Sequence, residues 1–186
     1  LLAAAERYDV RILRDRFGVP HVYGKTDPDV AYGLAFAHSE DDFDTIQRTV
    51  LASRGRLASV DGLDAVPADF LFHWLGVPEA LARYEEDVSP EARAVAEAYA
   101  AGVNHYAALH PGAVLPGAIP ATGKDVVAGF AFRTPFFYGL ERSLLELFGD
   151  ERKREIALGP SESAFHAVAG PAAALGSNAI AVAPRR

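Results

Sequence analysis

Ser177 is the residue whose surroundings best suit a chemical role. It follows Gly176, at the end of a run of small residues (167–176), and it opens a small, apolar, strand-like segment that reads Ser-Asn-Ala-Ile-Ala-Val-Ala. A serine hydroxyl in this position can attack the preceding carbonyl, and an N→O acyl shift followed by hydrolysis of the ester would split the chain. Gly176 suits this step because it removes steric hindrance and tolerates a strained peptide.

Cleavage before Ser177 would give one residue that holds both a nucleophile and a base. The freed α-amino group has a pKa of about 7.7–8.0 in model compounds, so it can accept the hydroxyl proton near neutral pH. The alternative without a catalytic function is an ordinary Gly-Ser turn before a strand, in a non-catalytic helical module. From the pattern alone, the ordinary turn is the favoured interpretation.

The N-terminal part of the chain predicts a hairpin. Residues 9–13 and 19–23 read as two short strands, joined by a turn over 14–18 in which Gly18 can take a positive φ. Pro20 has no N–H to donate, so we expect it at the edge or the first position of its strand.

The rest of the chain predicts helices. Asp27 as N-cap and Pro28 at the first position predict a helix to about Ser53, and Ser89-Pro90-Glu91 starts the clearest helix. Residues 110–123 read as a long loop and 78–84 as a short helix. We expect a helix from Asp125 that Pro135 breaks or kinks, and helix again over 140–148. In the apolar patch 69–75, we expect Phe70, Phe72 and Trp74 in the core.

Composition excludes several classes of protein. The 186 residues carry a formal net charge of −7 and no block of five Lys or Arg, so a nucleic-acid partner is not expected. No apolar run approaches the ~18 residues of a membrane span. The sequence has no Cys, which excludes disulfides and thiolate metal sites.

Two features lead us to expect a processed piece of a longer polypeptide. The sequence has no Met, so its first residue would come from processing or trimming, with any signal peptide already removed. A buried strand over 177–183 with no partner after it would leave its backbone groups unpaired.

Several stretches resemble, in order, segments of the penicillin acylase family of N-terminal nucleophile hydrolases. Residues 15–23 (Asp-Arg-Phe-Gly-Val-Pro-His-Val-Tyr) resemble the family's opening D-x-x-G-V-P-H-I-x signature. Residues 29–41 and the Arg-Gly-Arg-Leu of 54–57 resemble its first helix, and 89–106 resemble its S-P-E…A-Y-A-x-G-V-N-x-Y helix. Residues 176–182 are similar to the start of the family's β-chain, the catalytic chain.

The resemblance implies an α+β fold, in which a largely helical α-chain packs around, and adds strands to, the αββα sandwich of an N-terminal nucleophile hydrolase. Residues 1–166 would be the α-chain, 167–176 a linker before the cleavage site, and 177–186 the first strand of the β-chain. The implied protein is an αβ heterodimer, periplasmic or secreted, that matures by autoproteolysis. Its oxyanion hole would lie beyond residue 186.

The resemblance also implies an acylase that acts on a linear amide. The strand at Ser177 looks closest to the N-acyl-homoserine lactone and lipopeptide acylases, with a β-lactam (penicillin or cephalosporin) acylase as the alternative. Phe136, Phe137 and Tyr138 fall where the family's pocket helix breaks, so we expect them to form an apolar wall of the acyl pocket, with core packing as the alternative.

No cofactor is required by this chemistry, although the resemblance suggests a structural Ca²⁺ with Glu141 or Glu146 as a ligand. We expect His21 to bond locally within its hairpin. The acidic cluster Glu40, Asp41, Asp42 and Asp44 offers oxygen ligands for a cation, but on one helix these residues spread around the surface, so we expect a solvated face.

Overall fold

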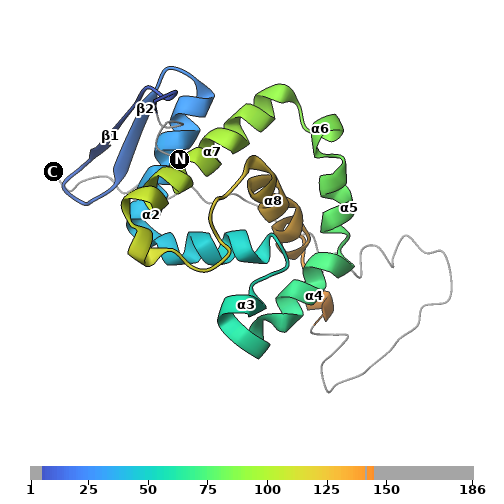
Figure 1. Cartoon of the computed structure of the whole chain (residues 1–186). Helices are drawn as coiled ribbons and strands as arrows, with labels where there is room; N and C mark the ends of the chain where they lie inside the picture. The colour runs from blue at the N-terminus through green and yellow to red at the C-terminus, as the bar shows by residue number, and fades with distance from the viewer. Residues whose placement is uncertain (1–5, 141, 145–186) are drawn as a thin grey trace, which may run out of the picture. The chain divides into compact units, whose positions relative to one another are not determined.

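The computed structural model describes residues 6–140 and 142–144 (Figure 1). The chain divides into two units, Leu1–Arg133 and Thr134–Arg186. The described residues are mostly helical, with one two-stranded sheet. The expected largely helical α+β character is therefore confirmed for this part of the chain.

The N-terminal hairpin forms as expected. Strands β1 (Val10–Arg14) and β2 (Pro20–Gly24) pair antiparallel, from Val10 opposite Gly24 to Arg14 opposite Pro20. The Asp15 carboxylate accepts the N–H groups of Phe17 (2.8 Å) and Val19 (3.0 Å), and Gly18 takes a φ of 82°. Pro20 is the first residue of its strand, which confirms that prediction.

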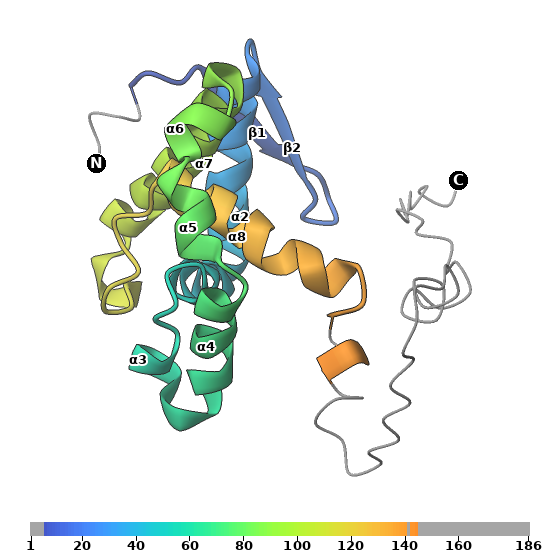
Figure 2. The same ribbon diagram turned by 90° about the vertical axis from the view of Figure 1, so that its right-hand side faces the viewer.

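Helix α2 (Asp27–Ala52) begins one residue earlier than expected, at the residue predicted to be its cap. Thr26, and not Asp27, is the N-cap, and it shares a capping box with Asp29. Asp29 also accepts the backbone N–H of Asp9 at 2.9 Å. This bond ties the start of the hairpin to the start of the helix, and both strands lie along α2 (Figure 2).

A kink at Asp42 divides α2 into two helical parts. Asp42 has φ −156° and ψ 76°, and its carboxylate accepts the N–H of Thr45 at 3.1 Å, so it caps the second part from inside. The single uninterrupted helix expected from residue 27 to residue 53 is therefore wrong at this point.

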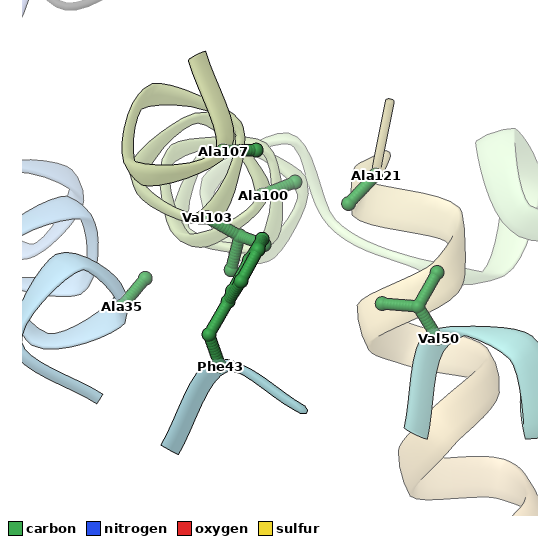
Figure 3. Packing of buried hydrophobic residues seen from close by; sticks show 7 residues of the cluster. All are labelled: Ala35, Phe43, Val50, Ala100, Val103, Ala107 and Ala121. Carbon is green, nitrogen blue, oxygen red and sulfur yellow. The ribbon is translucent and has the colours of Figure 1, made fainter. Parts of the chain in front are cut away.

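Helix α7 (Pro90–Leu109) packs against α2. Ser89 is its N-cap and accepts the N–H of Ala92, as the sequence predicted. The two helices approach closely at Gly102, where an added Cβ would lie 2.9 Å from Ala35 Cβ and even closer to the Tyr32 carbonyl oxygen. Figure 3 shows buried side chains of the core between these helices and the loop before α8: Ala35, Phe43, Val50, Ala100, Val103, Ala107 and Ala121.

Aromatic rings extend this contact between α2 and α7. Tyr106 lies 5.0 Å from Phe43 and 5.7 Å from Phe36, measured between ring centroids. The Tyr32 hydroxyl hydrogen-bonds to Nδ1 of His105. The pair of helices thus forms the main core of the first unit.

Short helices connect α2 to α7. They are α3 (Ala58–Asp61), the 3-10 helix η1 (Gly62–Ala65), α4 (Val66–Trp74), α5 (Val77–Ala82) and α6 (Tyr84–Asp87). On α4 the expectation of three core aromatics is wrong for two of them. Phe72 is buried, whereas Phe70 and Trp74 are exposed because they lie on the opposite side of the helix.

The loop after α7 contains the 3-10 turn η2 (Pro111–Ala113) and leads into α8 (Gly123–Phe137). This last helix starts two residues before Asp125, which accepts the N–H of Thr122. Pro135 does not break α8, which continues to Phe137. Helical backbone is present again at Leu140 and at 142–144, in agreement with the expected restart.

Candidate functional site

The residues expected to carry the chemistry fall into two groups. Gly176 and Ser177, and the two candidate calcium ligands Glu141 and Glu146, lie outside the described residues. The aromatic segment Phe136–Tyr138 is described. The structure therefore gives the local geometry of the expected pocket wall and the scaffold that holds the start of its helix.

The aromatic segment ends α8. Phe137 is the last helical residue, and the N–H of Tyr138 still bonds to the Thr134 carbonyl at 3.2 Å. Gly139 follows with φ 91°, a left-handed conformation that turns the backbone away from the helix. The Phe137 and Tyr138 rings are nearly perpendicular, 5.6 Å apart, and are 66% and 69% exposed. Such rings are available to line a pocket and do not serve as core of the described residues.

Arg54 fixes the start of α8. Its Nε and Nη2 atoms each lie 2.7 Å from an oxygen of Asp125, which is the bidentate arrangement. The remaining donors reach the carbonyl oxygens of Gly117 (2.6 Å) and Pro120 (2.7 Å). One guanidinium thus joins the end of α2, the loop and the first turn of α8.

The Arg54–Asp125 pair is largely removed from water, since the Asp125 side chain is only 9% exposed. Burial by itself would raise the pKa of Asp125, but hydrogen bonds from Arg54 and Thr122 outweigh it and hold this pKa below its ordinary value. The carboxylate therefore stays ionised and continues to hold the loop at neutral pH.

Two buried amides hold the same loop at other points. Gln47 donates to the Ala113 carbonyl (2.9 Å) and accepts the N–H of Leu115 (2.6 Å). Asn104 likewise donates to the carbonyl of Ala121 (2.8 Å) and accepts its N–H (2.7 Å). These reciprocal bonds pair the polar groups of both buried side chains with the loop backbone, as buried polar groups require.

Sequence reasoning missed these three loop contacts. A signal was nevertheless present, because Arg54 and Asn104 both lie within the segments that resemble the family, 54–57 and 89–106. Gln47 had no such signal. The contacts assign a positioning function to these family-like segments.

The hairpin signature also has a structural function. His21 lies with Nε2 3.6 Å from the Asp15 carboxylate, so its contact is within the hairpin as expected, at a distance longer than a hydrogen bond. Arg14 donates to the carbonyl oxygens of Gly18 (2.8 Å) and Ala37 (3.2 Å), which joins the end of the hairpin to α2.

The acidic cluster on α2 is exposed, as expected, and each of its carboxylates already has a partner within the protein. Arg14 pairs with Glu40 (2.9 Å) and Asp41 (2.8 Å), Asp42 caps the helix, and Asp44 pairs with Arg48 (2.6 Å). Within residues 6–140 and 142–144, no group of three or more His, Asp or Glu side chains is arranged to hold a metal ion. None of the helices in this part of the chain is long and apolar enough to cross a membrane.

Known proteins similar to this chain are acylases. It is 36% identical over 107 residues to the penicillin acylase 2 proenzyme of Pseudomonas sp. (strain SE83), an alignment that covers 58% of this chain and 14% of the relative. It is 32% identical over 113 residues to the acyl-homoserine lactone acylase PvdQ of Pseudomonas savastanoi pv. phaseolicola, covering 55% and 14%. The matched part thus spans about one seventh of either relative.

The fold has a counterpart among solved structures. A chain of the thermostable penicillin G acylase from Alcaligenes faecalis superposes with a TM-score of 0.56 and 22% identity, covering 96% of this chain and 98% of that one. The sequence model of the penicillin amidase family matches residues 9–186, which include every segment on which the resemblance rested. The chain therefore belongs to the penicillin amidase family.

Proposed function

We propose that this chain is the helical part of an N-terminal serine amidohydrolase, an acylase that hydrolyses linear amides. The observation that carries the proposal is the family match over residues 9–186, because this interval includes Gly176 and Ser177. Ser177 is the proposed nucleophile, and its own α-amino group, freed by autoproteolysis, is the proposed base.

The proposed organisation follows the expected domains. Residues 1–166 form the α-chain, 167–176 a linker, and 177–186 the first strand of the catalytic β-chain, which comes from the same precursor. Within the described residues, β1 and β2 pair only with each other. Each strand therefore has a second edge, which supports the proposal that the hairpin adds strands to the αββα sandwich.

The proposed reaction has two steps. The Ser177 hydroxyl loses its proton to the α-amino group and attacks the amide carbonyl, and the amine leaves with that proton, so an acyl ester remains on Ser177. Water then attacks the ester, aided by the same amino group. This releases the carboxylic acid and restores the hydroxyl.

The proposed substrate carries a hydrophobic acyl chain, as in an N-acyl-homoserine lactone. The PvdQ relative and the exposed rings of the aromatic segment support this choice. The second candidate is a β-lactam acylase, which the 36% identity to penicillin acylase 2 favours. We further propose a periplasmic or secreted location and, with Glu141 or Glu146 as a ligand, a structural Ca²⁺ that takes no part in the chemistry.

The nucleophile is tested on the full-length precursor by mass spectrometry of the intact product. We expect the wild type to be cut between Gly176 and Ser177, the variant Ser177→Ala to remain one chain, and the nearby control Ser163→Ala to be cut like the wild type. Cleavage of Ser177→Ala at the same bond would refute the assignment.

The substrate class is tested on the matured enzyme. A series of acyl-homoserine lactones is compared with penicillin G by kcat/KM. We expect higher values for the lactones, and an equal or higher value for penicillin G would favour the β-lactam acylase instead.

A further inference from the structure

An exposed apolar stripe runs along η1 and α4. It consists of Leu63 (87% exposed), Val66 (47%), Phe70 (63%) and Trp74 (58%). Their spacing of three, four and four residues places them on one side of the two consecutive helical segments. Large apolar side chains gathered in this way indicate a contact surface.

The other side of α4 already packs in the core. Phe72 is only 4% exposed, its ring lies 6.1 Å from that of Phe132, and an added Cβ at Gly55 would lie 2.7 Å from it. A helix with apolar residues on opposite sides is typical of a helix buried between two layers. The described residues supply one of these layers.

The area of the stripe argues against a second copy of this chain as the other layer. The exposed parts of its four side chains amount to on the order of 400 Å², since a buried aromatic side chain covers ~150–250 Å². A stable interface takes about 800 Å² from each partner, so the stripe suits one part of a larger interface.

The charge around the stripe argues against a membrane surface. Residues 61–75 contain three Asp and no Lys or Arg. Helices that lie on membranes carry basic residues on their polar side, because these attract anionic lipids. An acidic border instead fits a protein partner.

We propose that the stripe on η1 and α4 is a docking surface for the catalytic β-chain, the part of the precursor that begins at Ser177. This inference rests on the proposed function. The length of the relatives supports it, because the matched part spans only 14% of each, which leaves ample chain to form the second layer. Trp74 and Phe70 then anchor the α-chain to the β-chain.

Trp74 provides a direct test, because it is the only Trp among residues 1–186. Hydroxyl-radical footprinting with peptide mass spectrometry measures its oxidation rate in the full-length precursor and in the matured enzyme. We expect oxidation to be about tenfold slower than in the urea-unfolded protein, as for a buried interface aromatic. A rate within about twofold of the unfolded protein would overturn the proposal.

A variant tests whether the contact holds the chains together. In the matured enzyme, the α-chain with the double substitution Phe70→Glu and Trp74→Glu should separate from the β-chain on size-exclusion chromatography. The control is Leu109→Glu, at an exposed residue at the end of α7, and its α-chain should co-elute with the β-chain as in the wild type. Co-elution of the double variant would count against the proposal. If the double variant does not fold, the footprint of the wild type decides.

Other occupants give different results. If Trp74 is protected only when anionic phospholipid vesicles are present, the stripe binds a membrane surface and the proposal is overturned. The proposal is also overturned if the wild type has the mass of a dimer of this chain and the double variant has the mass of one copy. The footprint on uncut precursor also separates this inference from the proposed function. A precursor that is never cut before Ser177 but protects Trp74 would refute the nucleophile and leave the docking surface in place.

Discussion

Arg54 illustrates how much of this scaffold depends on single polar side chains. Its guanidinium bonds to Asp125 and to two carbonyl groups of the loop between η2 and α8. Gln47 and Asn104 hold the same loop by reciprocal amide bonds. Arg54 therefore holds the first turn of α8, whose far end carries the aromatic segment, and side chains of α2 and α7 hold the loop before it.

Removal of the Arg54 side chain should lower the stability of the fold. Arg54→Ala leaves the Asp125 carboxylate buried without its cation, so we expect the free energy of unfolding to fall by about 3–5 kcal/mol. The control is Arg83→Ala, since the Arg83–Asp87 pair is exposed and should contribute less than about 0.5 kcal/mol. Urea unfolding followed by circular dichroism measures both, and similar losses in the two variants would contradict the prediction.

The same ion pair should make the fold sensitive to acid. The folded-state pKa of Asp125 is lowered because, against the effect of burial, Arg54 and Thr122 hydrogen-bond to the ionised form. Its contribution is therefore present above the unfolded pKa of about 3.9 and is lost as the pH falls through the lower folded value.

This acid sensitivity can be measured by urea unfolding at pH 7, 5 and 3. Asp125→Asn should be less stable than the wild type at pH 7 and lose less stability on acidification. Asp125→Asn should still lose some stability on acidification, because hydrogen bonds also lower the pKa values of Asp15, Asp29 and Asp42. Equal losses in wild type and variant between pH 5 and pH 3 would show that Asp125 does not titrate as described.

At the scale of elements, the sequence predicted features that depend on nearby residues but did not predict contacts between distant residues. The hairpin and the Ser89 cap of α7 were predicted because their turn and cap residues act within a few positions. The Arg54–Asp125 pair was not, because its partners are 71 residues apart. The kink at Asp42 was missed for another reason: an acidic residue on an exposed helix face looks the same in sequence whether or not it caps the following turn.

The aromatic side chains of α4 show a second limit of the sequence prediction. Phe70, Phe72 and Trp74 alternate in sequence, and hydrophobicity alone placed all three in the core. On a helix, residues two apart face nearly opposite directions, so Phe72 packs inside while the other two are exposed. The aromatic segment lies at the end of α8, but the helix ends at Phe137 and not at the break expected at Pro135, and the function of the segment as a pocket wall stays a prediction.

The crossing of α2 and α7 gives a test at this scale. Gly102→Ala places a methyl group against Tyr32 and Ala35, so the helices must separate, and we expect a loss of about 1–3 kcal/mol in unfolding free energy. Gly129→Ala is the matched control. An added Cβ at Gly129 of α8 meets nothing within 4 Å, so this change should stabilise the helix by up to ~1 kcal/mol. Thermal unfolding that ranks the two variants in the opposite order would contradict the close approach.

At the scale of the whole molecule, the chain is a scaffold whose proposed chemistry requires more protein than these residues. The matched part spans about one seventh of the acylases to which it is similar. In the proposed enzyme, two exposed apolar surfaces of this chain would each contact another molecule or chain. The stripe on η1 and α4 would contact the β-chain, and the aromatic segment would contact the acyl chain.

The aromatic segment can be tested separately from the stripe, because its proposed ligand is the substrate. Phe137→Ala removes a ring from the proposed pocket wall, and the extra space should shift the preference of the matured enzyme toward longer or bulkier acyl chains. The readout is kcat/KM across a series of acyl-homoserine lactones of increasing chain length. Phe17→Ala is a matched control, because Phe17 is exposed to a similar extent in the hairpin turn and should leave the profile unchanged. If the chain-length preference of Phe137→Ala is unchanged, this ring serves in packing. If both variants shift the preference, the cause is a general loss of structure and not a change in the pocket.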